Sequence, residues 1–149
     1  MPRLFFLILL VAVLTLVQSF NFSILGVKPN LSLIAVIAAS FFIIDIWEGF
    51  LLTAISAFLL KFSPVLTREL IVFIGIAFVV VILRNYLPWR RFLNNLILVA
   101  LATFAFYVFT AGDFLYSVLF WKELFFNLLF GGLIFALLFP CGKMEKKNL

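Results

Sequence analysis

Two carboxylates inside a very apolar segment are the residues of this chain whose spacing could support chemistry. Asp45 and Glu48 lie three residues apart within the run SFFIIDIWEGF at positions 40–50. On one continuous helix they would share a face, and an acidic pair at membrane depth is typical of a proton-handling site. At a solvated turn the same pair would have no chemical role. A third interpretation is a salt bridge to one of the arginines Arg84, Arg90 and Arg91.

The composition indicates which solvent surrounds these carboxylates. The chain has 149 residues, of which 67% are hydrophobic and 11% charged, and its mean hydropathy is +1.34. A soluble domain is roughly 45–50% apolar and about 25% charged. So few polar groups could not cover a surface that faces water. We therefore expect an all-α integral membrane protein, with a single domain over residues 1–149 and the lipid bilayer around it.

Residue counts exclude several kinds of site. The chain has no histidine and a single cysteine, Cys141. A His/Cys metal site, a Ser-His-Asp triad and a disulfide framework are therefore excluded. The net charge of +5 comes from basic residues placed between apolar runs, which does not indicate nucleic-acid binding. We expect no catalytic, cofactor-binding or metal-binding residues, and a protein that is not an enzyme.

The basic residues decide how often the chain crosses the membrane. A crossing needs about 20 helical residues, so the apolar run 31–60 is too long for one crossing and short for two. If it crosses twice, seven basic residues face the cytoplasm and four face outward; if it crosses once, these numbers are exchanged. The positive-inside rule therefore favours two crossings. The seven are Arg3, Arg84, Arg90, Arg91, Lys143, Lys146 and Lys147, and the four are Lys28, Lys61, Arg68 and Lys122.

This reasoning predicts six transmembrane helices with both termini in the cytoplasm. The expected spans are about 4–21, 31–46, 48–62, 70–84, 92–111 and 122–139. Asp45 and Glu48 then lie in a tight cytoplasmic hairpin, where Gly49 eases the turn. Two alternatives stay open. The pair 31–46 and 48–62 could be re-entrant, and the first run could be a signal peptide that is cleaved near Val17-Gln18-Ser19.

Small residues suggest where helices approach closely. Ser32, Ala35 and Ala39 share one helical face, as do Thr53 with Ala57 and Gly132 with Ala136. Such spacing favours close helix contacts in lipid, either within the subunit or with a partner helix. We expect the face of Ser32, Ala35 and Ala39 to contribute to a partner seam. Asn94, Asn95 and Asn127 could hydrogen-bond between helices, but for Asn94 and Asn95 the inner membrane interface is the favoured position. Arg68–Glu69 and Lys122–Glu123 resemble interfacial pairs.

Two segments resemble the rod shape-determining MreD family. They are KPNLSLIAVIAASFF (28–42) and EGFLLTAISAFLLKFSP (48–64). In that family a Pro-Asp-Leu-like entry opens the second span and a Gly-Phe pair opens the third. Pro29-Asn30-Leu31 and Gly49-Phe50 occupy these places, with Asn30 where the family usually has aspartate. The length, the six expected spans and the basic loop 84–91 also match.

The resemblance implies a non-enzymatic scaffold subunit of the cell-elongation machinery in the bacterial inner membrane. Such a subunit would bind a bitopic MreC-like partner and act with peptidoglycan synthases. The resemblance adds Gly49 and Phe50 to the expected partner-binding residues. The family's fold is similar to that of the substrate-binding subunits of energy-coupling-factor vitamin transporters, which supplies the alternative function. Those subunits commonly carry Ala-x-x-x-Ala in the first span, where this chain has only Ala12.

Overall fold

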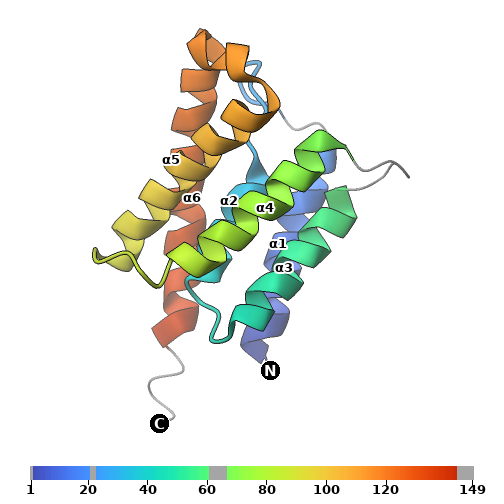
Figure 1. Ribbon diagram of the computed structural model, residues 1–149. Helices are drawn as coiled ribbons and strands as arrows, with labels where there is room; N and C mark the ends of the chain where they lie inside the picture. Colours follow the sequence, from blue (N-terminus) through green and yellow to red (C-terminus); the bar gives the residue numbers. More distant parts are fainter. Residues whose placement is uncertain (1, 21–22, 61–66, 144–149) are drawn as a thin grey trace.

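The protein is built from α-helices. The computed structural model describes residues 2–20, 23–60 and 67–143. Six α-helices and one short 3-10 helix occupy these ranges (Figure 1). The all-α class predicted from the sequence is confirmed for this described part. In chain order the elements are α1 (Pro2–Ser19), α2 (Leu31–Ser40), α3 (Ile46–Leu60), α4 (Arg68–Leu83), α5 (Arg91–Thr110), η1 (Gly112–Tyr116) and α6 (Val118–Lys143).

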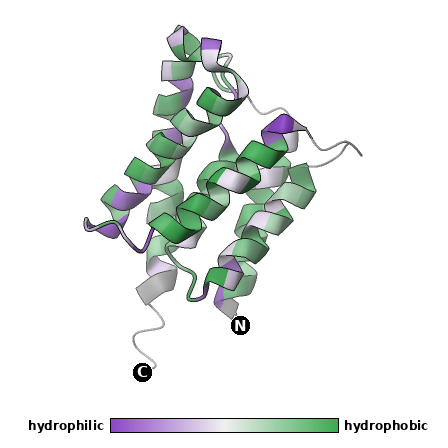
Figure 2. Cartoon of the chain, in the orientation of Figure 1, coloured by the Kyte–Doolittle hydropathy of each residue, from purple (hydrophilic) through white to green (hydrophobic). Residues whose placement is uncertain are grey.

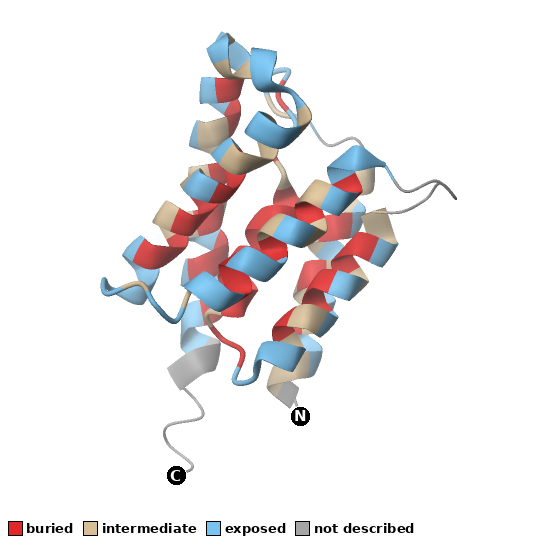
Figure 3. Ribbon diagram, in the orientation of Figure 1, coloured by how far each residue is buried: buried red, intermediate tan, exposed pale blue. Residues whose placement is uncertain are grey.

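Helix α2 forms the centre of the bundle. It contacts each of the other five α-helices, and all ten of its residues are buried (Figure 3). Its sequence LSLIAVIAAS explains this position, because small and aliphatic side chains let neighbouring helices approach on every side. Asn30 begins the helix as its N-cap: the Asn30 side chain accepts a hydrogen bond from the backbone N–H of Leu33 at 3.2 Å.

The apolar run 31–60 is divided into two helices, but earlier than the sequence predicts. Residues 41–45 connect α2 to α3, whereas the expected spans 31–46 and 48–62 place the break at residue 47. Phe41 and Phe42 follow α2 and pack on Phe135 of α6, with ring centroids 5.9 and 5.1 Å away. Because Phe135 is distant in the sequence, no local pattern could have placed the end of α2 at Ser40.

The other helix boundaries lie near the predicted ones, except those of α6. Helices α1, α3, α4 and α5 begin and end within two residues of the expected spans. Helix α6 begins at Val118 instead of residue 122 and continues through Pro140 to Lys143. Pro140 lies in the last turn of α6, where its missing N–H removes one helical hydrogen bond close to the point at which the helix ends. The expected ends at residues 21 and 62, and the charge of Lys61, lie outside the described residues.

Two helices are long and apolar enough to cross a membrane. They are Arg91–Thr110 in α5 and Val118–Pro140 in α6, and only 33% of the apolar window of each is buried inside the protein. A core helix of a soluble protein would be mostly buried. Figure 2 colours most of α1, α3 and α4 as hydrophobic. Large apolar side chains on these helices are exposed, among them Phe5, Phe58 and Ile71. This outward apolar surface indicates association with a membrane.

Helix length alone does not establish six crossings. Helices α1 to α4 have between 10 and 18 residues, below the roughly 20 that a bilayer core of about 30 Å requires. At about 1.5 Å per residue, α2 covers only half of that thickness. The structure supports a coarser statement than the predicted six transmembrane helices: in its described residues the protein is all-helical, with two helices of membrane-spanning length.

The helices run alternately in opposite directions, so the connections gather at two ends (Figure 1). Two contacts join the start of α1 to the start of α3, and the end of α4 to the 41–45 connection. Nη2 of Arg3 lies 4.0 Å from Oε2 of Glu48, and Nη1 of Arg84 donates to the carbonyl oxygen of Ile43 at 3.5 Å. We call this the N-terminal end of the bundle; α6 also ends there. The α1–α2 connection and η1 lie at the opposite end.

Candidate functional site

The Asp45–Glu48 pair belongs to an exposed connection. Asp45 is exposed just before α3, and Glu48 lies in the first turn of that helix. The carboxylate of Glu48 accepts a hydrogen bond from the backbone N–H of Ile44 at 2.9 Å, and Arg3 approaches the same oxygen. The pair therefore lies at the surface of the bundle and not in its interior. The ion-pair partner is Arg3, which the sequence did not single out.

The small residues of α2 are used inside the subunit. Ser32, Ala35 and Ala39 are fully buried. Oε1 of Gln18 in α1 accepts hydrogen bonds from both the backbone N–H and the hydroxyl of Ser32, at 2.7 and 2.9 Å. A partner helix could reach this face only by displacing a helix of the bundle. Internal packing, the alternative that the sequence left open, is the role of this face in the structure.

Gly49 and Phe50 also make contacts within the subunit. A Cβ atom at Gly49 would lie 2.7 Å from a Val81 methyl and 2.8 Å from Cδ1 of Ile43. Glycine is therefore required because α3 and α4 pack very closely there, and not because it eases a turn. Phe50 is partly buried, and its ring centroid lies 4.7 Å from that of Phe78 in α4. The sequence assigned Gly49 to the turn and did not identify this close approach of α3 and α4.

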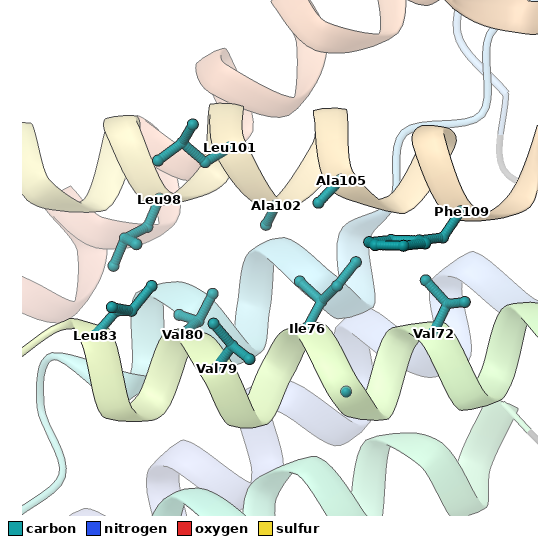
Figure 4. A pocket seen from close by; sticks show the side chains of 11 residues that line it. Val72, Ile76, Val79, Val80, Leu83, Leu98, Leu101, Ala102, Ala105 and Phe109 are labelled. Atoms are coloured by element: carbon teal, nitrogen blue, oxygen red, sulfur yellow. The ribbon is translucent and has the colours of Figure 1, made fainter. Parts of the chain in front are cut away.

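An open apolar groove lies between α4 and α5, on a surface that the sequence did not single out. It encloses about 410 Å³. Side chains of both helices point into it along its length (Figure 4). Small residues widen it: Ala102 and Ala105 lie on the α5 side, and a Cβ atom at Gly75 on the α4 side would meet nothing within 4 Å. The full lining is Val72, Gly75, Ile76, Val79, Val80, Leu83, Leu98, Leu101, Ala102, Ala105 and Phe109.

The groove has the properties of a site for an apolar helix. Its lining residues carry no charged or polar side chain. In lipid, helices associate through close packing and not through water release, so small residues at a groove floor are favourable. The groove could not be predicted from the sequence. The small residues of the groove are separate positions on two helices, and they form one surface only when those helices pack together.

A buried polar cluster lies toward the opposite end of the bundle. We define it as Asn30, Thr103, Tyr107, Glu123 and Asn127. Oδ1 of Asn127 accepts from the backbone N–H of Asn30, and its Nδ2 donates to Oγ1 of Thr103, both at 3.1 Å. The hydroxyl of Tyr107 donates to the carboxylate of Glu123. The cluster therefore joins α5 and α6 to the start of α2.

Glu123 differs from the sequence-based expectation. Lys122 and Glu123 were expected to form an interfacial pair, but Lys122 is exposed while Glu123 is only 5% exposed and faces Tyr107. Adjacent helical residues point in directions about 100° apart, so one of the two turns inward when the other faces out. The prediction that Asn127 hydrogen-bonds between helices is confirmed.

The asparagines at the start of α5 are buried as well. Nδ2 of Asn95 donates to the carbonyl oxygen of Gly131 in α6 at 3.0 Å, so Asn95 makes a contact between helices and does not face the inner interface, the position that the sequence favoured. Asn94 instead holds the α4–α5 loop through the carbonyl oxygens of Leu87 and Trp89. Within the described ranges no three His, Cys, Asp or Glu residues lie together in a way that could hold a metal ion.

The fold and its surfaces define an all-helical bundle with an outward apolar face, a closed polar cluster and an open apolar groove. Comparison of the chain with protein-family models, with curated proteins and with solved structures finds no match.

Proposed function

We propose that this protein is a multi-pass scaffold subunit of the bacterial cell-elongation machinery, in the inner membrane. Its α4–α5 groove holds the single transmembrane helix of a bitopic MreC-like partner. The partner's extracytoplasmic part is thereby positioned among peptidoglycan synthases. The observation that carries the proposal is the groove itself, an open and wholly apolar channel with small residues on both walls.

The proposed membrane arrangement has both termini in the cytoplasm. Arg3, Arg84, Arg90 and Arg91 all belong to the N-terminal end of the bundle, which the positive-inside rule assigns to the cytoplasm. Helix α2 need not span the bilayer alone. Because α2 is enclosed by other helices, the irregular backbone at its ends is shielded from lipid, and such backbone is tolerated only in protein-enclosed positions.

Complementary packing is the proposed mechanism of partner binding. A lipid-embedded groove gains little from apolar burial, since lipid tails already solvate it. Affinity then depends on how closely the two backbones approach, which the missing side chain of Gly75 and the short side chains of Ala102 and Ala105 permit. No step of catalysis is involved.

Filling the groove tests the proposal. We would change Gly75→Leu and Ala105→Leu, and use Ala54→Leu as the matched control, because Ala54 is exposed on α3 and lies outside the groove. Each tagged protein is purified from its native membranes, and co-purifying proteins are identified by mass spectrometry. We expect the unchanged protein and the control to recover a bitopic shape protein with peptidoglycan synthases, and both groove variants to lose them. Equal recovery by all forms would overturn the groove assignment.

A vitamin carrier is the second candidate function, and the buried polar cluster is the observation that favours it. Tyr107, Glu123 and Asn127 place hydrogen-bonding groups between α5 and α6 near the expected outer side. The same purification separates the two functions. Recovery of a pair of ATPases with a larger membrane subunit would replace the scaffold by a substrate-binding subunit of an energy-coupling-factor transporter.

A further inference from the structure

A second, polar pocket lies at the N-terminal end of the bundle. It encloses about 280 Å³ between the α2–α3 connection, the α4–α5 loop and the first turn of α5. In contrast to the groove, most of its surface is polar, and two arginines contribute to it. Its lining residues are Phe41, Ile43, Ile44, Arg84, Asn85, Leu87, Trp89, Arg91 and Asn94.

Arg84, one of the residues that line this pocket, carries an unsatisfied donor. Its Nη1 makes a long hydrogen bond of 3.5 Å to the carbonyl oxygen of Ile43, while its buried Nε has no hydrogen-bond partner among the described residues. Burial lowers the pKa of Arg84 in this loop; the carboxylate of Glu48 opposes that effect, and the charges of Arg3 and Arg91 add to it. The guanidinium stays charged at neutral pH, so an anion bound beside it would offset the cost of burying it.

Asn94 adds an unsatisfied acceptor. The side chain is 4% exposed, and its Nδ2 donates to the carbonyl oxygens of Leu87 and Trp89, both at 3.1 Å. These two bonds fix the orientation of the amide, since its oxygen could not replace the nitrogen as a donor. Oδ1 has no partner among the described residues. A buried polar atom without a partner costs about 1–3 kcal/mol, so the pocket favours a ligand with a donor group.

The pocket therefore combines fixed positive charge with one acceptor. Phosphate oxygens suit Arg84 and Arg91, and a hydroxyl group suits Oδ1 of Asn94. Apolar surface adjoins these groups: Ile44 and Trp89 are 66% and 56% exposed, beside the polar lining. An exposed tryptophan next to basic residues is typical of the lipid headgroup level of a membrane, and basic pockets between helices on the cytoplasmic side suit anionic headgroups.

We propose that this pocket binds the headgroup of an anionic phospholipid with a hydroxylated headgroup, of the phosphatidylglycerol type, from the cytoplasmic leaflet. The phosphate lies between Arg84 and Arg91, a headgroup hydroxyl donates to Asn94, and the glycerol backbone contacts Trp89. The site is separate from the α4–α5 groove and requires no protein partner. It rests on the membrane location in the proposed function but not on the scaffold role.

Native mass spectrometry of the purified full chain in detergent tests this site directly. Phosphatidylglycerol, phosphatidylethanolamine and phosphatidylcholine with identical acyl chains are added one at a time, without any partner protein. We expect phosphatidylglycerol to bind most tightly. Arg84→Gln and Arg91→Gln should each weaken it about tenfold, because each removes a charge-assisted hydrogen bond. Equal binding of the three lipids would overturn the proposal.

A charge-matched control separates a site from general attraction. Arg90→Gln removes the same charge from the same loop, but Arg90 is exposed and does not line the pocket. Binding should stay unchanged in this variant, and a loss equal to that of Arg91→Gln would contradict the proposed site. If Arg84→Gln fails to fold, the exposed Arg91 carries the test.

Thermal unfolding, measured with either the lipid or a soluble anion added, distinguishes a lipid site from a site for a free anion. Phosphatidylglycerol should raise the melting temperature of the unchanged protein and not that of Arg91→Gln, since only a ligand of the folded state stabilises it. Inorganic phosphate or glycerol phosphate at the same concentration should have no effect. An equal rise with either of these would make the pocket a site for a soluble anion and overturn the lipid assignment.

Discussion

The side chain of Asn127 in α6 holds the backbone at the start of α2. Its Oδ1 accepts a hydrogen bond from the backbone N–H of Asn30 at 3.1 Å, and its Nδ2 donates to Thr103 of α5 at the same distance. Asn127 is fully buried. One amide therefore joins three helices at the point where the central helix begins, next to the N-cap that Asn30 provides.

Replacing this amide should destabilise the bundle. Asn127→Leu leaves the backbone N–H of Asn30 without its acceptor, and we expect a loss of about 1–2 kcal/mol in the free energy of unfolding. Unfolding by titration with a denaturing detergent measures it. Asn85→Leu is the control, because Asn85 is exposed and should change stability by less than about 0.5 kcal/mol. Equal free energies of unfolding for the two variants would show that the Asn127 contact does not stabilise the bundle.

The close contact at Gly49 should tolerate no side chain. Gly49→Ala places a methyl group 2.7 Å from Val81, and such overpacking costs about 1–3 kcal/mol. Adding Val81→Ala should restore part of the loss by removing the methyl groups that clash. At Gly132 the nearest atom to a new Cβ is 3.7 Å away, so Gly132→Ala should be neutral or stabilising by up to about 1 kcal/mol. Identical effects at the two glycines would refute this packing account.

The tight turn between α1 and α2 contains a strained residue. Leu25 has φ +52° and Gly26 has φ +80°, while Ile24 and Val27 pair through backbone hydrogen bonds of 2.8 and 2.9 Å. Two consecutive positive φ angles suit Asn-Gly and not Leu-Gly. Leu25→Asn should therefore raise the free energy of unfolding by about 1 kcal/mol. Little packing is lost, since Leu25 is 79% exposed.

The same unfolding titration tests this turn, and Gly26→Ala supplies the opposite change. That substitution forces a side chain into the left-handed region and should destabilise the protein. If Leu25→Asn lowers stability, then the leucine makes a contact that outweighs its backbone strain.

The negative charges of Asp45 and Glu48 should contribute little to the stability of the bundle or to partner binding. The double variant Asp45→Asn with Glu48→Gln keeps an acceptor for the N–H of Ile44. It removes a partly exposed ion pair with Arg3 and the charge attraction between Glu48 and Arg84. We expect a change below about 1 kcal/mol and unchanged partner recovery, measured by unfolding and by co-purification.

Glu48→Leu is the informative comparison for this pair. It removes the acceptor as well as the charge, so it should cost more than the double variant. Loss of function by the double variant at a normal protein level would restore the interpretation of the pair as a proton relay.

The sequence by itself determined the properties that depend on composition and on local periodicity. The scarcity of charged residues predicted an apolar outer surface, and Phe5 and Phe58 do face outward. The division of the run 31–60 followed from charge counting, and four of the six α-helices, α1, α3, α4 and α5, lie within two residues of their expected positions. These features could be predicted because each depends on residues that are close together in the chain.

The tertiary structure alone decided which faces are buried and which polar groups meet. Ser32, Ala35 and Ala39 could have faced a partner or the core, and only the enclosure of α2 by five helices assigns them to the core. The groove at Gly75 and the pocket at Arg84 each combine segments from different helices. A one-dimensional pattern gives the face of a helix but not the neighbour on that face, because the neighbour is set by packing across the whole bundle.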